Sequence, residues 1–509
     1  MDGTNESQMK ELECLFTWGV EKSDMKDLDT LLKNHLHRVS VSPIRYHATY
    51  FHILAFVSHL KGDDEAALDY LHKAEDALKK DKRDEADFVV TYSSLAWIHN
   101  HLGNQENKEF YLNQVKSIRQ DTRPAVHGEK GWSLMKMGPK YYERAKESFE
   151  KALEIKPEHQ SYNMGYGVVL YRMEDLDTEY EIQPEDSAAV KQLKKTLALY
   201  PDFTEAMTLL AVKKTQESRE LVLKALSLSP NDKNINDYVV NYLKKCSPEE
   251  SLEMIKSALV QTPTSAFLNH KAGLCYKEKY VQLIMSGRRD EAAADVKECI
   301  RFLSEAVRLD PSNTYAMMNL AEAYAEDHQL QMAVDIFKKA LAQNPNSDIL
   351  NLKAGLCYKK KYVQLIMSWR RDEAAADMKE CIRFLSEAVR LDPSNTYAMM
   401  NLAEAYAEDN QLPRAEKIFT DLIRAYQLRE KDKQHCHFIY GKFLFFKWND
   451  EDRSVEQYKE AYKIHVYSEE RKKVRKLLEN IAETKGGQKG KAIKAFLTAE
   501  DKKRIQPKN

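Results

Sequence analysis

Four side chains in one stretch of the sequence are of the types that bind a phosphorylated base. Trp132 and Lys136 are four residues apart, as are Val168 and Arg172, so each pair shares one face of a predicted helix. An indole offers a stacking surface to a base, and ammonium or guanidinium groups at close range neutralise phosphate oxygens. We therefore interpret this stretch as a pocket for the 5′ end of an RNA.

Three predicted helices joined by turns would position these side chains. The first carries Trp132 and Lys136, the second runs from Tyr141 to Lys156, and the third ends with Arg172. Tyr142, near the start of the second helix, adds another aromatic ring. The alternative is that Trp132 fills the core of its own helical pair and that both cations are solvated.

The composition limits how an anion would be bound. The 509 residues include 78 Lys and Arg against 79 Asp and Glu, so anion binding must come from segregated charge and not from an excess of basic residues. The low content of Gly and Pro and the charged fraction of 31% are typical of a long, mostly helical protein.

Several sequence features bear on the compartment. No apolar run approaches the roughly 20 residues needed to cross a bilayer. The polar, acidic first residues predict neither a secretory nor a transit peptide. The seven cysteines have no CxxC spacing, which favours a reducing compartment and core positions for the thiols. We therefore expect a cytoplasmic protein without a membrane partner.

An internal duplication is the strongest repeat signal. The sequence that begins at Lys271 returns almost unchanged from Lys353, 82 residues later. A fixed period indicates a solenoid, and the first copy contains the tetratricopeptide (TPR) pattern of small, aromatic and proline residues. The preceding hairpin of each copy is longer than the template by about 14 residues. The pattern residues are Leu320, Ala321, Tyr324, Ala333, Phe337, Ala340 and Pro345.

No period-2 strand pattern of useful length is present, so the fold class predicted is all-α, a superhelix of stacked TPR hairpins. From Arg471 onward the sequence is strongly basic, which predicts a mobile tail at the end of the chain, and we expect no repeat after Lys485. The predicted segments are an amino-terminal TPR region over 1–127, a central region with the pocket over 128–270, the duplicated pairs over 271–352 and 353–434, a degenerate region over 435–485 and a basic mobile tail over 486–509.

The sequence carries no recognisable signature of catalysis. The sequence has no nucleophile elbow, HExxH motif, phosphate-binding loop or paired Cys/His site. The histidines at 35 and 37, and those at 435 and 437, are two residues apart and do not share a helical face. We therefore predict no catalytic residue, no metal ion and no cofactor.

Six segments carry a family resemblance along nearly the whole chain. They are, in order, FTWGVE, LAFVSHLKGDDEAAL, GWSLMKMGPKYYERAKESFEKALEIKPE, NMGYGVVLYR, QTPTSAFLNHKAGLCY and HCHFIYGKF. In these segments the chain resembles the interferon-induced proteins with tetratricopeptide repeats. The resemblance implies an antiviral RNA-binding protein of innate immunity whose superhelix encloses a positively charged central tunnel. Such a protein holds single-stranded RNA by a 5′-triphosphate or an incompletely methylated cap, without cleaving it.

The resemblance also implies roles for individual residues. Trp132 matches the cap-facing tryptophan, Val168 its partner across the guanine, and Lys136 and Arg172 the cations that contact phosphate. The other residues implied in RNA binding are Tyr142 in the pocket, Tyr238 on a tunnel-lining helix, His270 and Lys271 beside the first nucleotides, and His35 near the amino terminus.

Three positions depart from the family pattern. Leu31 stands where cap-binding relatives have an arginine, His35 where they have glutamine, and Asp237 where a tunnel arginine is expected. These changes weaken the predicted phosphate contacts. Lys33, His37 or Arg38 would compensate if their side chains turned inward.

A second hypothesis belongs to another functional class. Many TPR proteins are scaffolds or adaptors whose concave face binds peptide segments of protein partners. Homo- or hetero-oligomers with family members are compatible with either hypothesis.

Overall fold

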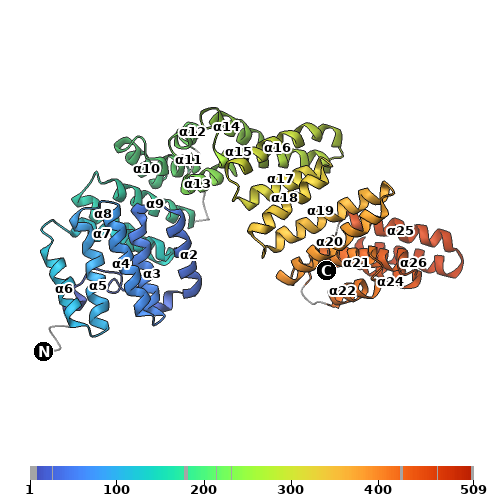
Figure 1. The fold of residues 1–509 in the computed structure, drawn as a ribbon, viewed down its shortest axis with the longest axis horizontal. Coiled ribbons are helices and arrows are strands. Elements are labelled where there is room, and N and C mark those ends of the chain that lie inside the picture. The colour runs from blue at the N-terminus through green and yellow to red at the C-terminus, as the bar shows by residue number, and fades with distance from the viewer. Residues whose placement is uncertain are drawn as a thin grey trace. The chain divides into compact units, whose positions relative to one another are not determined.

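The computed structural model describes residues 8–25, 27–176, 182–213, 215–230, 232–424, 428–466 and 468–505. Every regular element in these ranges is a helix, which confirms the all-α prediction. The chain divides into two compact units, Met1–Phe267 and Leu268–Asn509, and consecutive helices pair within each unit (Figure 1).

The first unit contains α2 to α14. Their bounds are α2 Leu28–Val41, α3 His47–Leu60, α4 Asp64–Lys80, α5 Val89–His101, α6 Gln105–Ser117, α7 Arg123–Met137, α8 Tyr142–Ile155, α9 Gln160–Leu176, α10 Ala188–Leu199, α11 Thr204–Val212, α12 Ser218–Leu228, α13 Lys233–Leu243 and α14 Pro248–Gln261.

Glycine positions explain how closely these helices approach one another. The ring of Phe149 on α8 is fully buried against Gly131 of α7 and Gly165 of α9. A Cβ atom at Gly131 would come within 2.8 Å of this ring, and one at Gly165 within 2.3 Å. The absence of a side chain at both positions therefore lets α7 and α9 pack on α8.

The second unit contains α15 to α26. Their bounds are α15 Ala266–Met285, which begins at the boundary, α16 Arg289–Leu309, α17 Thr314–Glu326, α18 Leu330–Gln343, α19 Asp348–Met367, α20 Arg371–Leu391, α21 Thr396–Glu408, α22 Leu412–Arg424, α23 Glu430–Phe446, α24 Glu451–Lys463, α25 Glu469–Lys485 and α26 Gly487–Ile505.

The duplication appears as two matching sets of four helices, α15 to α18 and α19 to α22. The first two helices of each set have 20 and 21 residues, which confirms the longer hairpin predicted for each copy. The same close contact recurs, because Gly273 faces Leu303 in the first copy and Gly355 faces Leu385 in the second.

The turns of the two copies, which we call the hairpin tips, share a left-handed backbone with different residues. Gly287 has φ +81° and its equivalent Trp369 has φ +61°. At the next tip His328 has φ +61° and its equivalent Asn410 has φ +59°. The side chain of Trp369 is 80% exposed.

The carboxy-terminal segment differs from the mobile tail expected over 486–509. One helix, α26, follows Lys485 and packs on α25. Ile493 and Leu497 are four residues apart and form a buried stripe in the same core cluster as Val474. The basic composition concealed this apolar face.

No described helix combines the length and the apolarity that crossing a membrane would require.

Candidate nucleic-acid interface

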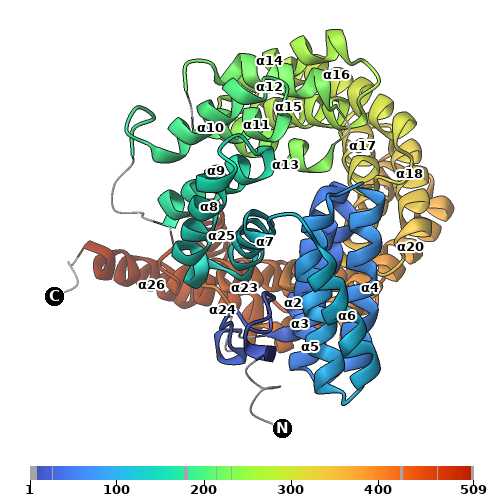
Figure 2. The same ribbon diagram turned by 90° about the vertical axis from the view of Figure 1, so that its left-hand side faces the viewer.

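A cavity of about 540 Å³ lies in the first unit. Side chains from α2, α3, α7, α9, α11 and α13 line it, and Figure 2 shows these helices curving around one region of the unit. The aromatic residues of the wall are Tyr46, Tyr50, Trp132, Tyr171 and Tyr238. The charged residues of the wall are Arg38, Lys136, Arg172, Lys244, Glu205 and Asp237.

Lys136 lies among aromatic rings. Its Nζ is 4.2 Å from the ring centroid of Tyr50, 5.1 Å from that of Tyr46 and 5.2 Å from that of Trp132. The ammonium also donates a hydrogen bond of 3.0 Å to the Tyr50 hydroxyl. Burial lowers the pKa of Lys136, and the nearby positive charge of Arg172 lowers it further. The aromatic rings partly offset the free energy cost of burying the ammonium, because their faces attract a cation.

Trp132 is both a core residue and part of the cavity wall. Its side chain is 6% exposed, and its Nε1 donates a hydrogen bond of 2.9 Å to the hydroxyl of Ser161. The indole packs edge-on against Tyr46 at 5.1 Å and Phe149 at 5.5 Å. The fixed indole thus fills the hairpin, as the alternative interpretation predicts, and also faces the cavity beside Val168.

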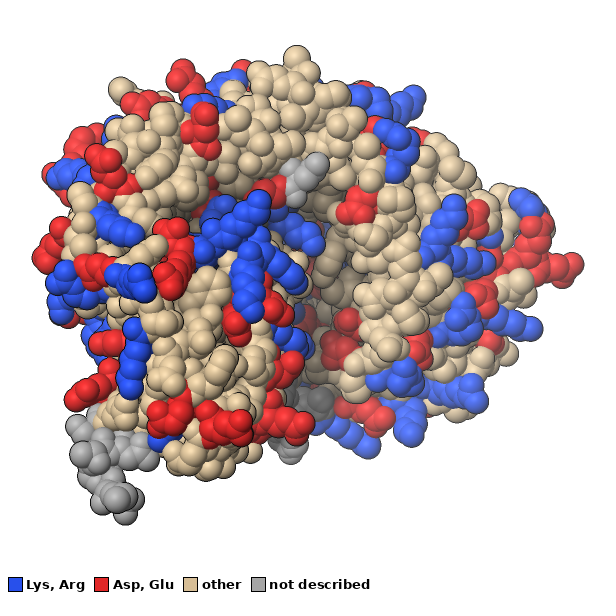
Figure 3. Space-filling view, turned by 60° about the vertical axis from the view of Figure 1, so that its left-hand side comes forward, with Lys and Arg blue, Asp and Glu red and all other residues tan. Residues whose placement is uncertain are grey.

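The basic side chains of the wall are available to an external anion. In the described parts of the chain, no carboxylate oxygen lies within 4.0 Å of the side-chain nitrogens of the four basic residues, Arg38, Lys136, Arg172 and Lys244. Arg172 Nη1 donates to the backbone oxygen of Met135 at 3.2 Å. Over most of the surface in Figure 3, acidic and basic residues are mixed. Near the centre of the view, Lys and Arg side chains gather together.

One of the two acidic residues in the wall is neutralised from within. Glu205 is 4% exposed and accepts hydrogen bonds from Arg45 at 2.6 Å and from the Tyr46 hydroxyl at 2.5 Å. Burial and the Glu205 charge raise the pKa of Tyr46 well above its ordinary value, so this hydroxyl stays protonated. Asp237 also lines the cavity, at the position where the family resemblance implies an arginine.

His35 faces the cavity as a neutral imidazole. It is 7% exposed, and neither ring nitrogen has a hydrogen-bond partner among the described residues. Burial lowers the pKa of His35 to about 4, and the charges of Lys136 and Arg38 contribute. An uncharged, unpaired imidazole in this wall can accept or donate one hydrogen bond to a ligand.

The structure brings together six of the nine predicted site residues. Trp132, Lys136, Val168, Arg172, Tyr238 and His35 all line the cavity. Tyr142 does not line it, because its ring is half-buried against the core of the first unit. His270 and Lys271 belong to the second unit, where the His270 Nε2 lies 3.5 Å from Asn319 Nδ2. As RNA-binding residues, all nine remain predictions.

Sequence reasoning missed several residues of the wall. Tyr46 and Tyr50 are four residues apart, a helical spacing that would have placed them on one face. Glu205 and Lys244 had no local signal. Of the compensating candidates, Arg38 lines the cavity and Lys33 and His37 do not. Leu31, one of the departures from the family pattern, packs partly buried against the core.

Comparison with known proteins identifies the repeats. The tetratricopeptide repeat family matches residues 126–159, 283–356 and 383–429. "Antiviral innate immune response effector IFIT1" of Macaca fascicularis is 30% identical over 363 residues, 66% of this chain and 75% of the relative. "Protein IFIT1 homolog B" of Homo sapiens is 28% identical over 496 residues, 94% of this chain and 88% of the relative.

Solved structures of human IFIT1 also match. The IFIT1 dimer with m7Gppp-AAAA is 23% identical, covers 91% of this chain and 100% of its own, and has a TM-score of 0.43. The dimer with PPP-AAAA is 24% identical, covers 82% and 99%, and has a TM-score of 0.40. The proteins of this family are non-catalytic TPR proteins. The chain belongs to the IFIT family, the interferon-induced proteins with tetratricopeptide repeats.

Proposed function

We propose that this chain is an antiviral RNA-binding protein that holds the 5′ end of single-stranded RNA in the first-unit cavity. The ligand class is RNA with a 5′-triphosphate or an incompletely methylated cap, which the protein sequesters in the cytoplasm and does not cleave. Holding this end blocks translation of foreign RNA. The same proposal includes a positively charged central tunnel enclosed by the superhelix.

The observation that carries this proposal is the position of Lys136. An ammonium group surrounded by rings, with a lowered pKa and no ion pair among the described residues, gains free energy when an anion enters. Arg172 and Arg38 add guanidinium groups, which bind phosphate oxygens with two parallel hydrogen bonds. A triphosphate supplies the several negative charges that such a cluster accommodates.

The family assignment supports the same ligand class. The macaque relative is named an antiviral innate immune response effector, and human IFIT1 has been solved with m7Gppp-AAAA and with PPP-AAAA. The human complexes are dimers, so we extend the proposal to homo- or hetero-oligomers with family members.

A binding assay with one short RNA carrying a 5′-triphosphate, a cap or a hydroxyl tests this function. We expect Trp132→Ala and Arg172→Glu to weaken binding of the first two RNAs at least about tenfold, with unchanged helical content. Arg123→Glu is the matched control, because Arg123 is an exposed arginine of the same unit that pairs with Asp121. Equal binding of all three RNA ends would refute the proposal.

A protein scaffold is the second candidate function. Its support is a groove of about 400 Å³ in the second unit, where Val281, Ile284 and Met285 lie beside lysine and glutamate side chains. Such a surface suits a peptide with apolar and charged residues. Site variants that remain folded and leave RNA binding unchanged would favour this alternative.

A further inference from the structure

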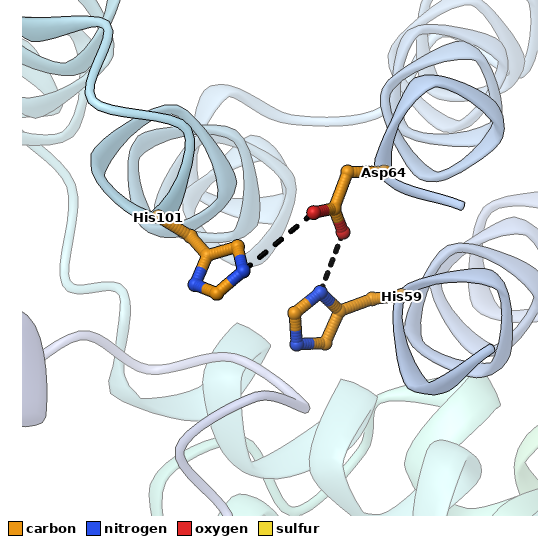
Figure 4. Close-up of side chains that lie close together, drawn as sticks. All are labelled: His59, Asp64 and His101. Carbon is orange, nitrogen blue, oxygen red and sulfur yellow. Dashed lines mark hydrogen bonds and ion pairs between the residues drawn. The ribbon is translucent and has the colours of Figure 1, made fainter. Parts of the chain in front are cut away.

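Two histidines and one aspartate converge at a corner of the first unit that takes no part in the cavity. Figure 4 shows the carboxylate of Asp64 between the imidazoles of His59 and His101. His59 Nδ1 lies 2.6 Å from Asp64 Oδ1, and His101 Nε2 lies 3.6 Å from Asp64 Oδ2. The three ligand atoms all lie within 4.8 Å of one another.

The ends of three helices bring these side chains together. His59 lies in the last turn of α3, Asp64 is the first residue of α4, and His101 is the last residue of α5. The short turn at Gly62 places Asp64 beside His59, and the packing of the next helical pair brings His101 to the same corner.

Aromatic packing orients both imidazoles. The Trp97 ring stacks on His101 at 5.6 Å with an interplanar angle of 8°, and it meets His59 edge-on at 5.1 Å. Phe16 also packs edge-on against His59 at 5.6 Å. The side chains of His59 and Asp64 are 17% and 19% exposed, and that of His101 is 51% exposed. The ligand atoms are thus held in place, and solvent reaches them from one side.

The chemistry of this set matches a particular class of ion. Zinc binds imidazole nitrogen and carboxylate oxygen at about 2.0 to 2.2 Å, so ligand atoms of a tetrahedral site lie roughly 3.3 Å apart. The present separations bracket this value, and small side-chain rotations would bring both nitrogens and one oxygen to it. Two imidazoles and one carboxylate suit zinc and similar transition ions, whereas magnesium and calcium prefer oxygen ligands.

We propose that His59, Asp64 and His101 form a binding site for a divalent transition ion of the zinc class. Three protein ligands leave the fourth position of a tetrahedral shell to water. The bound ion would join the ends of α3, α4 and α5 and so stabilise the first unit. This site is independent of the proposed RNA pocket.

The simpler interpretation is a hydrogen bond between His59 and Asp64 at the amino end of α4, with His101 merely nearby. The two interpretations differ in what His101 does. A hydrogen-bonded pair needs one imidazole, whereas an ion site loses affinity when either imidazole is replaced.

Trp97 provides the readout, because it contacts both imidazoles. In the full-length protein, adding Cu²⁺ or Co²⁺ should quench its fluorescence with one ion per chain, and Zn²⁺ should compete without quenching. His59→Gln and His101→Gln should each weaken ion binding at least about tenfold. Zn²⁺ at about 100 times its dissociation constant should raise the melting temperature by about 5 °C.

His72→Gln is the matched control. His72 has the same side-chain exposure as His101, 51%, and lies 4.0 Å from Glu75, but it is outside the cluster. Trp97→Phe should abolish the quenching and keep the Zn²⁺-dependent rise in melting temperature. Absent quenching in the parent protein, or equal affinities in the His59, His101 and His72 variants, would overturn the proposal.

Discussion

Lysines of the two units meet different partners. In the first unit the Lys136 ammonium lies among three aromatic rings and bonds to the Tyr50 hydroxyl. In the second unit Lys359 Nζ donates to Glu404 at 2.6 Å and to Asn401 at 3.1 Å, and Lys277 makes the equivalent contacts with Glu322 and Asn319.

This comparison separates two uses of the same residue type. The charges of Lys277 and Lys353 lower the pKa of Glu322 despite its burial, so these groups satisfy one another within the fold. Lys136 makes no ion pair among the described residues, and aromatic rings and a hydroxyl surround its ammonium. An anionic ligand would therefore be its first partner of opposite charge in direct contact. Charge partners, and not the number of lysines, distinguish a binding surface from a structural one.

The largest effect on RNA binding should come from removing the Lys136 ammonium of the first unit. We expect Lys136→Met to weaken binding of triphosphate RNA about 100-fold, because a phosphate would lose a charged donor in a low-dielectric site. The corresponding change in the second unit, Lys359→Met, should alter binding less than about threefold. Fluorescence anisotropy with labelled RNA measures both. Similar losses in the two variants would erase the distinction between the units.

Removing a carboxylate in the second unit should lower the stability of the fold and leave RNA binding unchanged. Glu322→Gln leaves Lys277 and Lys353 without a negative partner at a partly buried position, so we expect the free energy of unfolding to fall by about 2 kcal/mol. RNA binding should be unchanged. Glu305→Gln, which breaks the exposed pair with Arg308, should cost less than about 0.5 kcal/mol in the same urea titration. An equal effect of both variants would contradict the internal role of Glu322.

The neutral imidazole in the cavity predicts a pH dependence. The folded pKa of His35 is about 4, below the ordinary 6.5, so the unfolded chain binds more protons between these values. The contribution of His35 to the free energy of unfolding is therefore fully present above about pH 6.5, and it is lost as the pH falls from there towards 4. The free energy of unfolding should fall less between pH 7.5 and pH 5 in His35→Gln than in the parent protein, by about 1 to 2 kcal/mol in urea unfolding. An unchanged pH profile would show that His35 is not the group responsible.

The smallest effect concerns the hydroxyl that accepts from Lys136. Tyr50→Phe removes one hydrogen bond and keeps the ring, so the free energy of unfolding should fall by about 1 kcal/mol and RNA affinity should change less than about threefold. Paired measurements on the variant and the parent protein test this. A loss as large as that of Lys136→Met would assign the binding energy to the hydroxyl and not to the cation.

Much of the fold followed from the sequence, because repeat packing depends on local spacing. Small residues such as Gly273 and Gly355 recur where a facing leucine leaves no room for a Cβ atom, so the hairpins could be placed before the structure was known. The terminal helix α26 was harder to predict, because Ile493 and Leu497 lie in a strongly basic segment.

Local helical spacing also predicted part of the cavity wall. Helical spacing correctly put Trp132 with Lys136 on one face, and the family resemblance added Val168 and Arg172. Contacts between distant segments could not be read in this way. The bond from Tyr46 to Glu205 spans 159 residues and depends on how separate helices meet.

The hairpin tips of the duplicated copies carry a practical consequence. Since glycine and tryptophan, or histidine and asparagine, adopt the same left-handed turn at equivalent positions, the surrounding helices and not the local residue dictate the backbone there. Such positions accept new side chains without moving the helices. A cysteine placed at Trp369 would thus give an attachment point for a spectroscopic label that reports on the second copy and leaves the repeat contacts intact.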